Sequence, residues 1–590
     1  MKKNPVISKA RVYILIFALL SLIAFIVARV GFLYFDEAQQ YLRHGDNRSL
    51  KKVTVPADKG MIKGRNGEIL AITTVLYSLI VDLNHLRVSP NFSKGQARLA
   101  KKRISEFKSK MSQLAKILGK TEQQIEEDVF MQSPKRIQTY LAKDLIPEQI
   151  SQITELEMPA LVYERKLKRY YPYGAVLANL IGFSDYVEVG KSGIEKSYNQ
   201  HLQGKNGTML LRRDRVGNAI SYIANDNKYQ HGKNLTLTID TKIQDFTFFA
   251  LQEGLNQYLA KKGAAVVLNA KTGEILAMVS LPSYNTNDYA QRVKIGVKNI
   301  AIQDLFEPGS IVKPFLALAA LEANKIKADS KINLGDKGPK HQIKIANKTF
   351  KDSAPIDSNN VSIATVLKKS SNVGAIRLSK KLSQEQILAT YRKVGLGQPL
   401  SINLYGSKFR GVTPKQTTPL SKASLAIGYG LNASVLQIAR AYTVFANNGK
   451  LLKLRLTKDD NYKSTKVSNS KHINLIASWL RQVTDDDGTG KKAQISGFDV
   501  AGKTSTTLLS QGKQGYKNKK YLSSFVGMAP FKDPKIIVAV LVIEPRGKDY
   551  YGGDVAAPIF SQIAAKTLNY LGIKSEQQKP LISVLEGAPS

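Results

Sequence analysis

Three short polar stretches in this sequence carry the residue types that serine-based acyl transfer requires. They run from Ser310 to Lys313, from Ser370 to Asn372 and from Lys503 to Ser505. A serine and a lysine three residues apart share one face of a helix, so the amine can take the hydroxyl proton and leave a nucleophile. The spacing alone is a weak signal, because Ser-x-x-Lys occurs five times, starting at Ser49, Ser105, Ser310, Ser468 and Ser510.

Ser310 differs from the other four serines in its setting, LFEPGSIVKPFLALAALEA (305–323). Pro314 has no backbone N–H, so it is tolerated only in the first turn of a helix, which predicts a helix that starts near Ser310. The hydroxyl would then lie at the positive end of the helix dipole, beside backbone N–H groups without a helical partner. Such groups can stabilise an oxyanion, so Ser310 is the candidate nucleophile.

The stretch GFDVAGKTST (497–506) has two interpretations. Gly497 to Thr504 fits the G-x-x-x-x-G-K-T pattern of a phosphate-binding loop, which requires a helix that starts at Lys503. The following residues, STTLLSQGKQGYKNKKYLSS (505–524), are poor helix formers. We therefore expect a strand that forms one wall of an acyl-transfer site. Ser370-Ser371-Asn372 alone is typical of a helix cap, and only the three motifs together favour a shared site.

Composition narrows the classes of protein without naming a function. The chain has 590 residues, 87 Lys and Arg against 46 Asp and Glu, a formal charge of +41 and no cysteine. The absence of cysteine excludes disulfides, thiol nucleophiles and thiolate metal sites. The charge favours a polyanionic environment, but the sequence has no zinc-finger spacing or RNA-binding motif, so we do not expect a nucleic-acid partner.

The N-terminal region predicts a membrane anchor. Residues 12–35 form an apolar segment interrupted only by Arg29, and as a helix they would span about 36 Å, enough for the hydrocarbon core. Lys and Arg precede the segment, whereas Asp36 and Glu37 follow it. The positive-inside rule then places residues 1–11 in the cytoplasm and residues 36–590 outside it. A long apolar run without a clear cleavage site argues against a removed signal peptide.

The rest of the chain divides into a mixed region, 36–225, a second domain, 226–573, and a polar tail, 574–590. Within the mixed region, residues 94–118 have helical periodicity and a basic face typical of a solvated surface helix. In the second domain we expect a strand at 234–240, a helix at 241–260, two strands within 264–281, a mostly helical middle, three late strands and a helix within 554–572. This order predicts an α/β (α+β) domain with one mostly antiparallel sheet covered by helices.

The three motifs resemble the S-x-x-K, S-x-N and K-[ST]-G motifs of the penicillin-binding proteins, in the same order. The resemblance is to class B, division-specific (septal) peptidoglycan transpeptidases. It extends through ADKGMIKGRNGEILA (57–71), RYYPYGAVLANLIGF (169–183) and GKSGIEKSYNQHLQGKNG (190–207) to segments 428–450 and 550–560. The resemblance covers roughly residues 10–573. It implies a β-lactamase-like transpeptidase domain with a five-stranded sheet, preceded by an elongated non-catalytic pedestal and one transmembrane helix.

The resemblance also implies a catalytic role for each motif residue. Ser310 attacks the carbonyl between two terminal D-alanines of a peptidoglycan stem peptide, and Lys313 is the general base. The base must be a neutral amine, so we expect its pKa to be lowered by burial and by the charge of Lys503. Ser370 relays a proton to the leaving amine, and Asn372 positions the substrate amide.

The resemblance implies a substrate clamp on the late strand. Lys503, Thr504 and Thr506 would hold the terminal carboxylate, and the backbone N–H groups of Ser310 and Thr506 would form the oxyanion hole. Ser505 belongs to the same substrate-binding stretch but stands where the family usually has glycine, so its side chain is expected to crowd a bound β-lactam. No metal or cofactor is expected.

The pedestal departs from the family at Lys59 and Gly64, which replace an arginine and an aspartate. This departure weakens the expectation of an ion pair there.

Several functions remain open at the level of sequence. The same chemistry would serve an elongation-type transpeptidase, a D,D-carboxypeptidase or a β-lactamase. A division scaffold with weak activity and a polyanion-binding module are alternatives of other classes. The expected partners are stem peptides, β-lactams, a membrane-embedded septal glycan polymerase and other division proteins. The expected location is the bacterial inner membrane at the septum, with the catalytic domain in the periplasm.

Overall fold

The computed structural model describes residues 8–185, 188–213, 219–335, 340–411, 414, 416–509, 520–547 and 549–575. Most of the expected tail 574–590, part of the expected cytoplasmic segment 1–11, and Ser510 lie outside these residues. The chain forms two compact units. The first contains Met1–Asp58 and Gly204–Gly232, and the second contains Lys59–Gln203 and Lys233–Ser590.

The first unit consists of an apolar helix and a small sheet. Helix α1 (Lys9–Phe32) continues through a π-helical turn (Leu33–Glu37) into α2 (Ala38–Ser49). No residue of α1 is buried. Strands β1 (Leu50–Val55), β6 (Gly207–Arg213) and β7 (Ala219–Asn227) pair antiparallel in that order. Among the described residues, Lys9–Phe35 is the one helical stretch long and apolar enough to cross a membrane. Its exposed apolar surface fits the expected single-pass anchor.

The N-terminal lobe of the second unit is built on a long strand, β3 (Ile69–Asp82). This strand pairs antiparallel with β2 (Ile62–Lys63), β4 (Gln138–Leu145) and β5 (Leu161–Tyr170). Helices α3 (Lys94–Leu118), α4 (Glu122–Phe130) and α5 (Pro147–Glu155) pack on this sheet through an apolar cluster that includes Phe107 and Leu114. The predicted helix 94–118 is confirmed, because Ser93 caps its first turn and Gly119 ends it in a left-handed conformation.

A buried ion-pair cluster joins distant segments of this lobe. Glu195 accepts from the Lys59 Nζ at 2.6 Å and from the Arg169 Nε at 2.8 Å, and all three side chains are buried. Burial lowers the pKa of Lys59, although Glu195 opposes that shift. Burial alone would raise the pKa of Glu195, but Arg169 and Lys59 hold it below its usual value. An ion pair is therefore present here although lysine replaces the arginine of the family.

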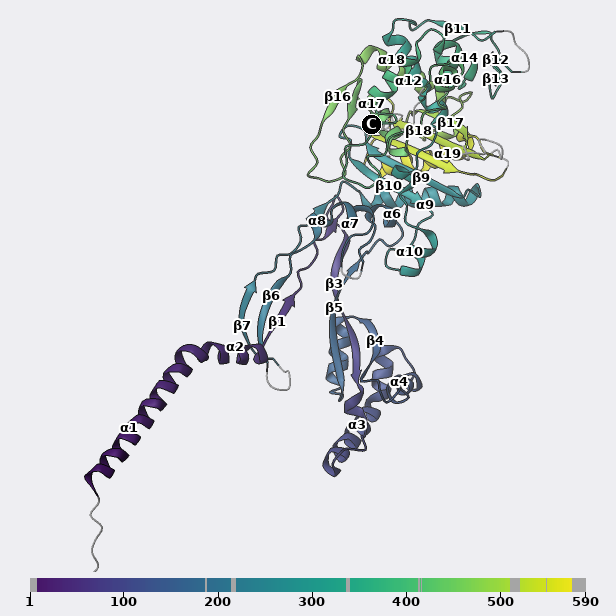
Figure 1. Ribbon diagram of the computed structural model, residues 1–590. Helices are drawn as coiled ribbons and strands as arrows, with labels where there is room; N and C mark the ends of the chain where they lie inside the picture. Colours follow the sequence, from purple (N-terminus) through teal and green to yellow (C-terminus); the bar gives the residue numbers. More distant parts are fainter. Residues whose placement is uncertain are drawn as a thin grey trace, which may run out of the picture. The chain divides into compact units, whose positions relative to one another are not determined.

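The C-terminal part of the second unit contains the five-stranded sheet that the sequence predicts (Figure 1). Its strands, in spatial order, are β10 (Ile275–Leu281), β9 (Lys262–Asn269), β19 (Ile536–Ile543), β18 (Tyr521–Ala529) and β17 (Ala501–Leu508). Every neighbouring pair is antiparallel. Two early strands thus lie beside three late ones, as expected from the sequence.

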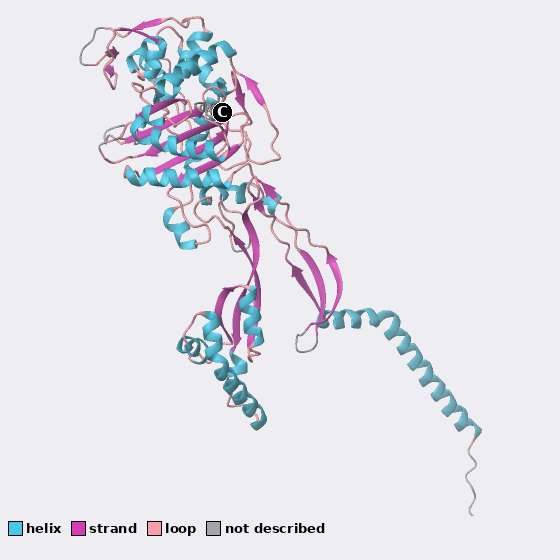
Figure 2. Cartoon of the chain, turned by 180° about the vertical axis from the view of Figure 1, so that it is seen from behind, coloured by secondary structure: helices cyan, strands magenta, loops and turns pink. Residues whose placement is uncertain are grey.

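Apolar side chains on alternate strand positions bury both faces of this sheet. Val267 and Val540 face a core formed with α9 (Thr241–Gln257) and α19 (Gly552–Tyr570). Val266 and Leu541 face the larger core of the helical region. Figure 2 shows helices lying across the strands of this sheet. A sheet covered on both faces requires the nearly continuous apolar runs that these strands carry.

The helical middle includes α12 (Lys313–Glu322), α13 (Ile363–Lys368), α14 (Asn372–Ser379), α17 (Val435–Ala446) and α18 (Ser470–Arg481). It also contains a hairpin of β12 (Gln342–Ile345) and β13 (Lys348–Lys351), which the sequence analysis did not predict.

The predicted strand 234–240 is wrong beyond its first residues, because only β8 (Leu235–Thr236) forms a ladder. The Leu237 N–H still donates to Lys63 of β2, whereas the N–H groups of Thr238 and Asp240 donate to Leu456 and Leu276, so the rest of the segment has no single partner strand.

Candidate active site

Ser310 lies in a single 3-10 turn, Gly309–Val312, that leads directly into α12. Gly309 has a φ of +58°, which allows the chain to turn sharply before the serine. Pro314 occupies the first turn of α12, where a missing N–H costs no helical hydrogen bond. The structure therefore places Ser310 at the start of a helix, as the sequence predicts.

Lys313 is buried behind this turn, with a side chain fully enclosed by protein. Its Nζ donates to the Ser370 carbonyl at 2.6 Å, to the Asn372 Oδ1 at 2.9 Å and to the Ser370 Oγ at 3.4 Å. Burial lowers the pKa of Lys313 to about 7, and the charge of Asp352 opposes the shift. A large fraction of Lys313 is thus a neutral amine near pH 7.

The sequence analysis expects the Lys313 amine to reach the Ser310 hydroxyl, and the structure differs from this expectation. Among the described residues, no hydrogen bond joins the two side chains, because the amine points to Ser370 and Asn372. A neutral amine has only two N–H groups, so loss of one proton must free the nitrogen from one of its three present acceptors.

Lys503 is the second buried lysine of the site, with no exposed surface. Its Nζ donates to the Ser370 Oγ at 2.9 Å and to the Thr504 carbonyl at 3.1 Å. Burial, and then the charge of Lys313, lower the pKa of Lys503 well below its usual value. The Ser370 hydroxyl therefore links the two amines, and Ser370 adopts a left-handed φ of +56° in doing so.

Asp352 holds the second motif in place and was missed by the sequence analysis. Its carboxylate accepts from the Ser371 Oγ at 2.9 Å and from the backbone N–H groups of Asn372 at 2.6 Å and Val373 at 3.0 Å. The carboxylate thus lies at the positive N-terminal end of α14. The signal in the sequence is one acidic residue after the basic segment KTFK (348–351), too weak to identify it.

The third motif lies within strand β17, so the phosphate-loop interpretation of Gly497 to Thr504 does not fit the structure. The Thr504 and Thr489 hydroxyls form a hydrogen bond of 2.8 Å, and the Thr506 Oγ1 accepts from the Gly552 N–H at 2.8 Å. These bonds fix Thr504 and Thr506 beside the cavity. Thr489 and Gly552 were not identified from the sequence.

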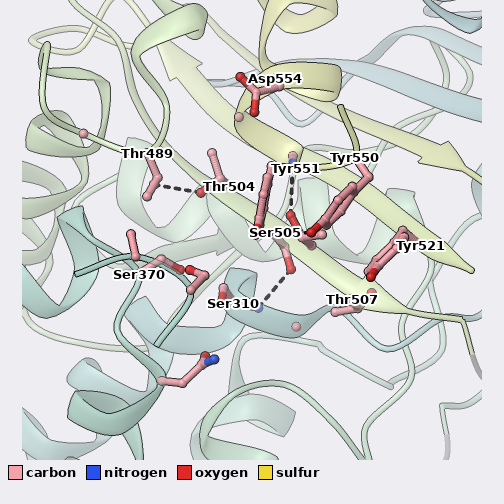
Figure 3. Close-up of a pocket in the computed structure, with 18 of the residues that line it drawn as sticks. Ser310, Ser370, Thr489, Thr504, Ser505, Thr507, Tyr521, Tyr550, Tyr551 and Asp554 are labelled. Carbon is pink, nitrogen blue, oxygen red and sulfur yellow. Dashed lines mark hydrogen bonds between the residues drawn. The ribbon is translucent and has the colours of Figure 1, made fainter. Parts of the chain in front are cut away.

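Ser505 points from the same strand toward the start of α12. Its Oγ accepts a hydrogen bond from the backbone N–H of Ser310 at 3.0 Å, and Ser505 is only 3% exposed (Figure 3).

A cavity of about 650 Å³ brings the motifs together. Its lining includes Ser310, Ser370, Asn372, Thr504, Ser505, Thr506 and Thr507. Lys313 and Lys503 do not line it themselves and reach it through their hydrogen bonds to Ser370 and Asn372. Stacked tyrosines also line it, with centroid distances of 4.1 Å between Tyr521 and Tyr550 and 4.6 Å between Tyr550 and Tyr551. The arrangement provides a hydroxyl nucleophile, a neutral amine and a row of hydroxyl donors.

Two family models match the chain. The penicillin binding protein transpeptidase domain matches residues 263–565, and the penicillin-binding protein dimerisation domain matches residues 54–237. The peptidoglycan D,D-transpeptidase FtsI of Buchnera aphidicola subsp. Schizaphis graminum is 33% identical and covers 94% of each chain. The FtsI of Escherichia coli K12 is 30% identical over 94% of this chain and 90% of its own.

A solved structure shares the fold. The crystal structure of penicillin binding protein 2X from Streptococcus thermophilus has a TM-score of 0.70 at 22% identity, and the match covers 88% of this chain and 80% of that one.

Proposed function

This chain belongs to the class B penicillin-binding proteins of FtsI type, a family of peptidoglycan D,D-transpeptidases, and we propose that it cross-links septal peptidoglycan through an acyl-enzyme on Ser310. The observation that carries the proposal is the buried Lys313, whose amine has a pKa of about 7 and donates to Ser370 and Asn372 of the second motif. A neutral amine at this place can accept the proton of a nearby serine.

In the acylation step, the Ser310 Oγ attacks the carbonyl carbon between the two terminal D-alanines of a stem peptide. The Ser310 proton passes to Lys313 as the C–O bond forms. Collapse of the tetrahedral intermediate breaks the C–N bond and releases D-alanine, whose amine takes the proton through the Ser370 hydroxyl. Ser370 suits this relay because its Oγ lies 3.4 Å from the Lys313 Nζ and 2.9 Å from the Lys503 Nζ.

Charge that develops on the carbonyl oxygen requires hydrogen-bond donors. The backbone N–H groups of Ser310 and Thr506 are the proposed oxyanion hole, and one such donor is typically worth about 3–4 kcal/mol. Asn372 is proposed to hold the substrate amide. Its own side chain is oriented by a bond from its Nδ2 to the Lys351 carbonyl at 3.0 Å.

The terminal carboxylate of the substrate is proposed to bind Lys503, Thr504 and Thr506. Burial disfavours the charged form of Lys503 in the free enzyme. A bound carboxylate supplies an opposite charge and restores that form, so binding and protonation of Lys503 support each other. An amine of a neighbouring stem then attacks the acyl-enzyme, which forms the cross-link and regenerates the Ser310 hydroxyl.

We propose that the apolar N-terminal helix anchors the protein in the inner membrane at the septum, with the catalytic domain in the periplasm. The basic Lys9 and Arg11 in the first turn of the helix, and the acidic Asp36 and Glu37 after the apolar segment, support this orientation. A membrane-embedded septal glycan polymerase and other division proteins are the proposed partners. The domain limits of the sequence analysis, with catalysis confined to 226–573, are part of the same proposal.

Labelling of full-length protein by a fluorescent penicillin tests the proposed nucleophile. The parent should carry one covalent adduct, and mass spectrometry should map it to the peptide that contains Ser310. Ser310→Ala should abolish labelling, whereas Ser468→Ala, which alters another Ser-x-x-Lys serine, should not. Persistent labelling of Ser310→Ala would show that another residue is the nucleophile.

A further inference from the structure

The Ser505 hydroxyl occupies a hydrogen-bond donor that the proposed reaction needs. The Ser310 N–H donates to the Ser505 Oγ at 3.0 Å (Figure 3). The same N–H is one of the two proposed oxyanion donors, and an N–H group has a single proton to donate. A substrate oxygen can bind this donor only when the Ser505 hydroxyl releases it.

The packing around Ser505 shows how closely its hydroxyl lies against the start of the nucleophile helix. A Cβ atom added to Gly309 would lie 2.4 Å from the Ser505 Oγ and 2.2 Å from the Thr507 Cγ2. Both distances are shorter than a carbon atom can make without a steric clash, so strand β17 packs directly against the turn that contains Gly309. Glycine at position 505 would place no side-chain atom there and would leave the Ser310 N–H open to the cavity.

We propose that the Ser505 hydroxyl competes with the acyl donor for the Ser310 N–H and thereby slows acylation by β-lactams. The inference rests on the proposed function. In the affected step the Ser310 Oγ adds to the lactam carbonyl, the ring C–N bond breaks, and the Ser310 proton passes through Lys313 to the ring nitrogen. The negative charge on the carbonyl oxygen is greatest during this step, so competition for a donor lowers the rate of bond formation more than the initial affinity.

The hydrogen bond and the bulk of the side chain can be separated by two substitutions. Ser505→Ala removes the acceptor and keeps the Cβ, whereas Ser505→Gly removes both. Ser524→Ala is the matched control, because Ser524 is buried and pairs with Ser505 across strands β17 and β18, yet no hydrogen bond among the described residues joins its side chain to the Ser310 N–H.

The measurement is the rate of labelling of full-length protein by a fluorescent penicillin over a concentration series. Such a series separates the limiting acylation rate constant from the apparent dissociation constant. Ser505→Ala should raise the limiting rate about 3- to 10-fold, the ratio that corresponds to one net hydrogen bond, with the apparent dissociation constant within about twofold of the parent. Ser505→Gly should raise the limiting rate at least as much, and Ser524→Ala should match the parent.

The inference is overturned if the limiting rate is unchanged or lower in both Ser505 variants while their unfolding temperatures match that of the parent. A gain in apparent affinity without a gain in limiting rate would also overturn it, because crowding alone would explain that result. Ser505→Gly carries the test if the alanine variant does not fold. If the parent adduct does not map to Ser310, the proposed function is wrong and this inference is wrong with it. If the adduct maps to Ser310 but the Ser505 variants have the parent's limiting rate, only the inference is wrong.

Discussion

Two clusters of buried lysines in this protein differ in whether the lysine amine is paired with a carboxylate. In the N-terminal lobe, Lys59 is in direct contact with the Glu195 carboxylate, which also pairs with Arg169. In the catalytic domain, Lys313 and Lys503 donate to neutral oxygen atoms, and the charge of Lys313 adds to the burial that lowers the pKa of Lys503. The first cluster keeps its charges in compensating contact, whereas the second favours loss of a proton. Paired burial is suited to holding segments together, and unpaired burial is suited to proton transfer.

The largest test of this difference removes the proposed base. Lys313→Gln should lower the acylation rate about 100- to 10,000-fold, because a side-chain amide cannot accept the Ser310 proton. The rate of labelling by a fluorescent penicillin measures the effect, with Lys380→Gln, on the exposed surface after α14, as the control. A Lys313→Gln protein that is labelled at the parent rate would exclude Lys313 as the base.

The corresponding change in the N-terminal lobe should affect stability instead of chemistry. Glu195→Gln removes the carboxylate that directly bonds buried Lys59 and Arg169, which should lower the free energy of unfolding by roughly 3–5 kcal/mol. Urea unfolding followed by circular dichroism measures this loss, and Glu155→Gln, at an exposed position, is the control. The variant that remains folded should still be labelled at Ser310. An unfolding transition equal to that of the parent would contradict the structural role of the pair.

The pH dependence of acylation should reflect the lowered pKa of Lys313. Above pH 7 the amine is mostly neutral and the rate should be level; below pH 7 the amine is protonated and the rate should fall about tenfold per pH unit. Labelling rates between pH 5.5 and 9 give the midpoint, with thermal unfolding at each pH to verify that the protein stays folded. A rate that does not change through pH 7 would show that the titration of Lys313 does not control acylation.

The smallest expected effect comes from Asp352, which influences Lys313 without contacting it. Its negative charge opposes the lowering of the Lys313 pKa. Asp352→Asn should therefore move the midpoint of the pH profile to lower pH, by less than about one unit, and reduce the level rate a few-fold because the cap of α14 weakens. Asp329→Asn, at an exposed position, should leave the profile unchanged. A shift to higher pH would contradict the assigned direction.

The sequence predicted those parts of the molecule that depend on local order. Helical periodicity identified α3, Pro314 indicated the start of α12, and apolar runs identified the strands of the catalytic sheet. These signals depend on backbone preferences and on burial of both sheet faces, which can be recognised in short windows. The motif order then predicted the residues that the structure brings together around the cavity.

The remaining parts depend on contacts between distant segments. Asp352 reaches the second motif only because the hairpin β12–β13 folds beside α14, and the Ser505 hydroxyl meets the Ser310 N–H across 195 positions. The strand predicted at 234–240 is confirmed only at Leu235–Thr236 for the same reason, since the N–H groups of Thr238 and Asp240 donate to two separate segments. Local patterns carry no information on which loop will lie against which helix.

The position of β19 in the sheet has a consequence for synthesis of the protein. This strand pairs with β9 on one side and β18 on the other, so the middle of the sheet is contributed by residues 536–543. During synthesis, more than 250 residues must follow β10 before β19 is available to pair with the free edge of β9. Such long-range pairing is slow. A nascent chain that stops before this strand would present an open, apolar edge, which makes incomplete chains targets for chaperones and proteases.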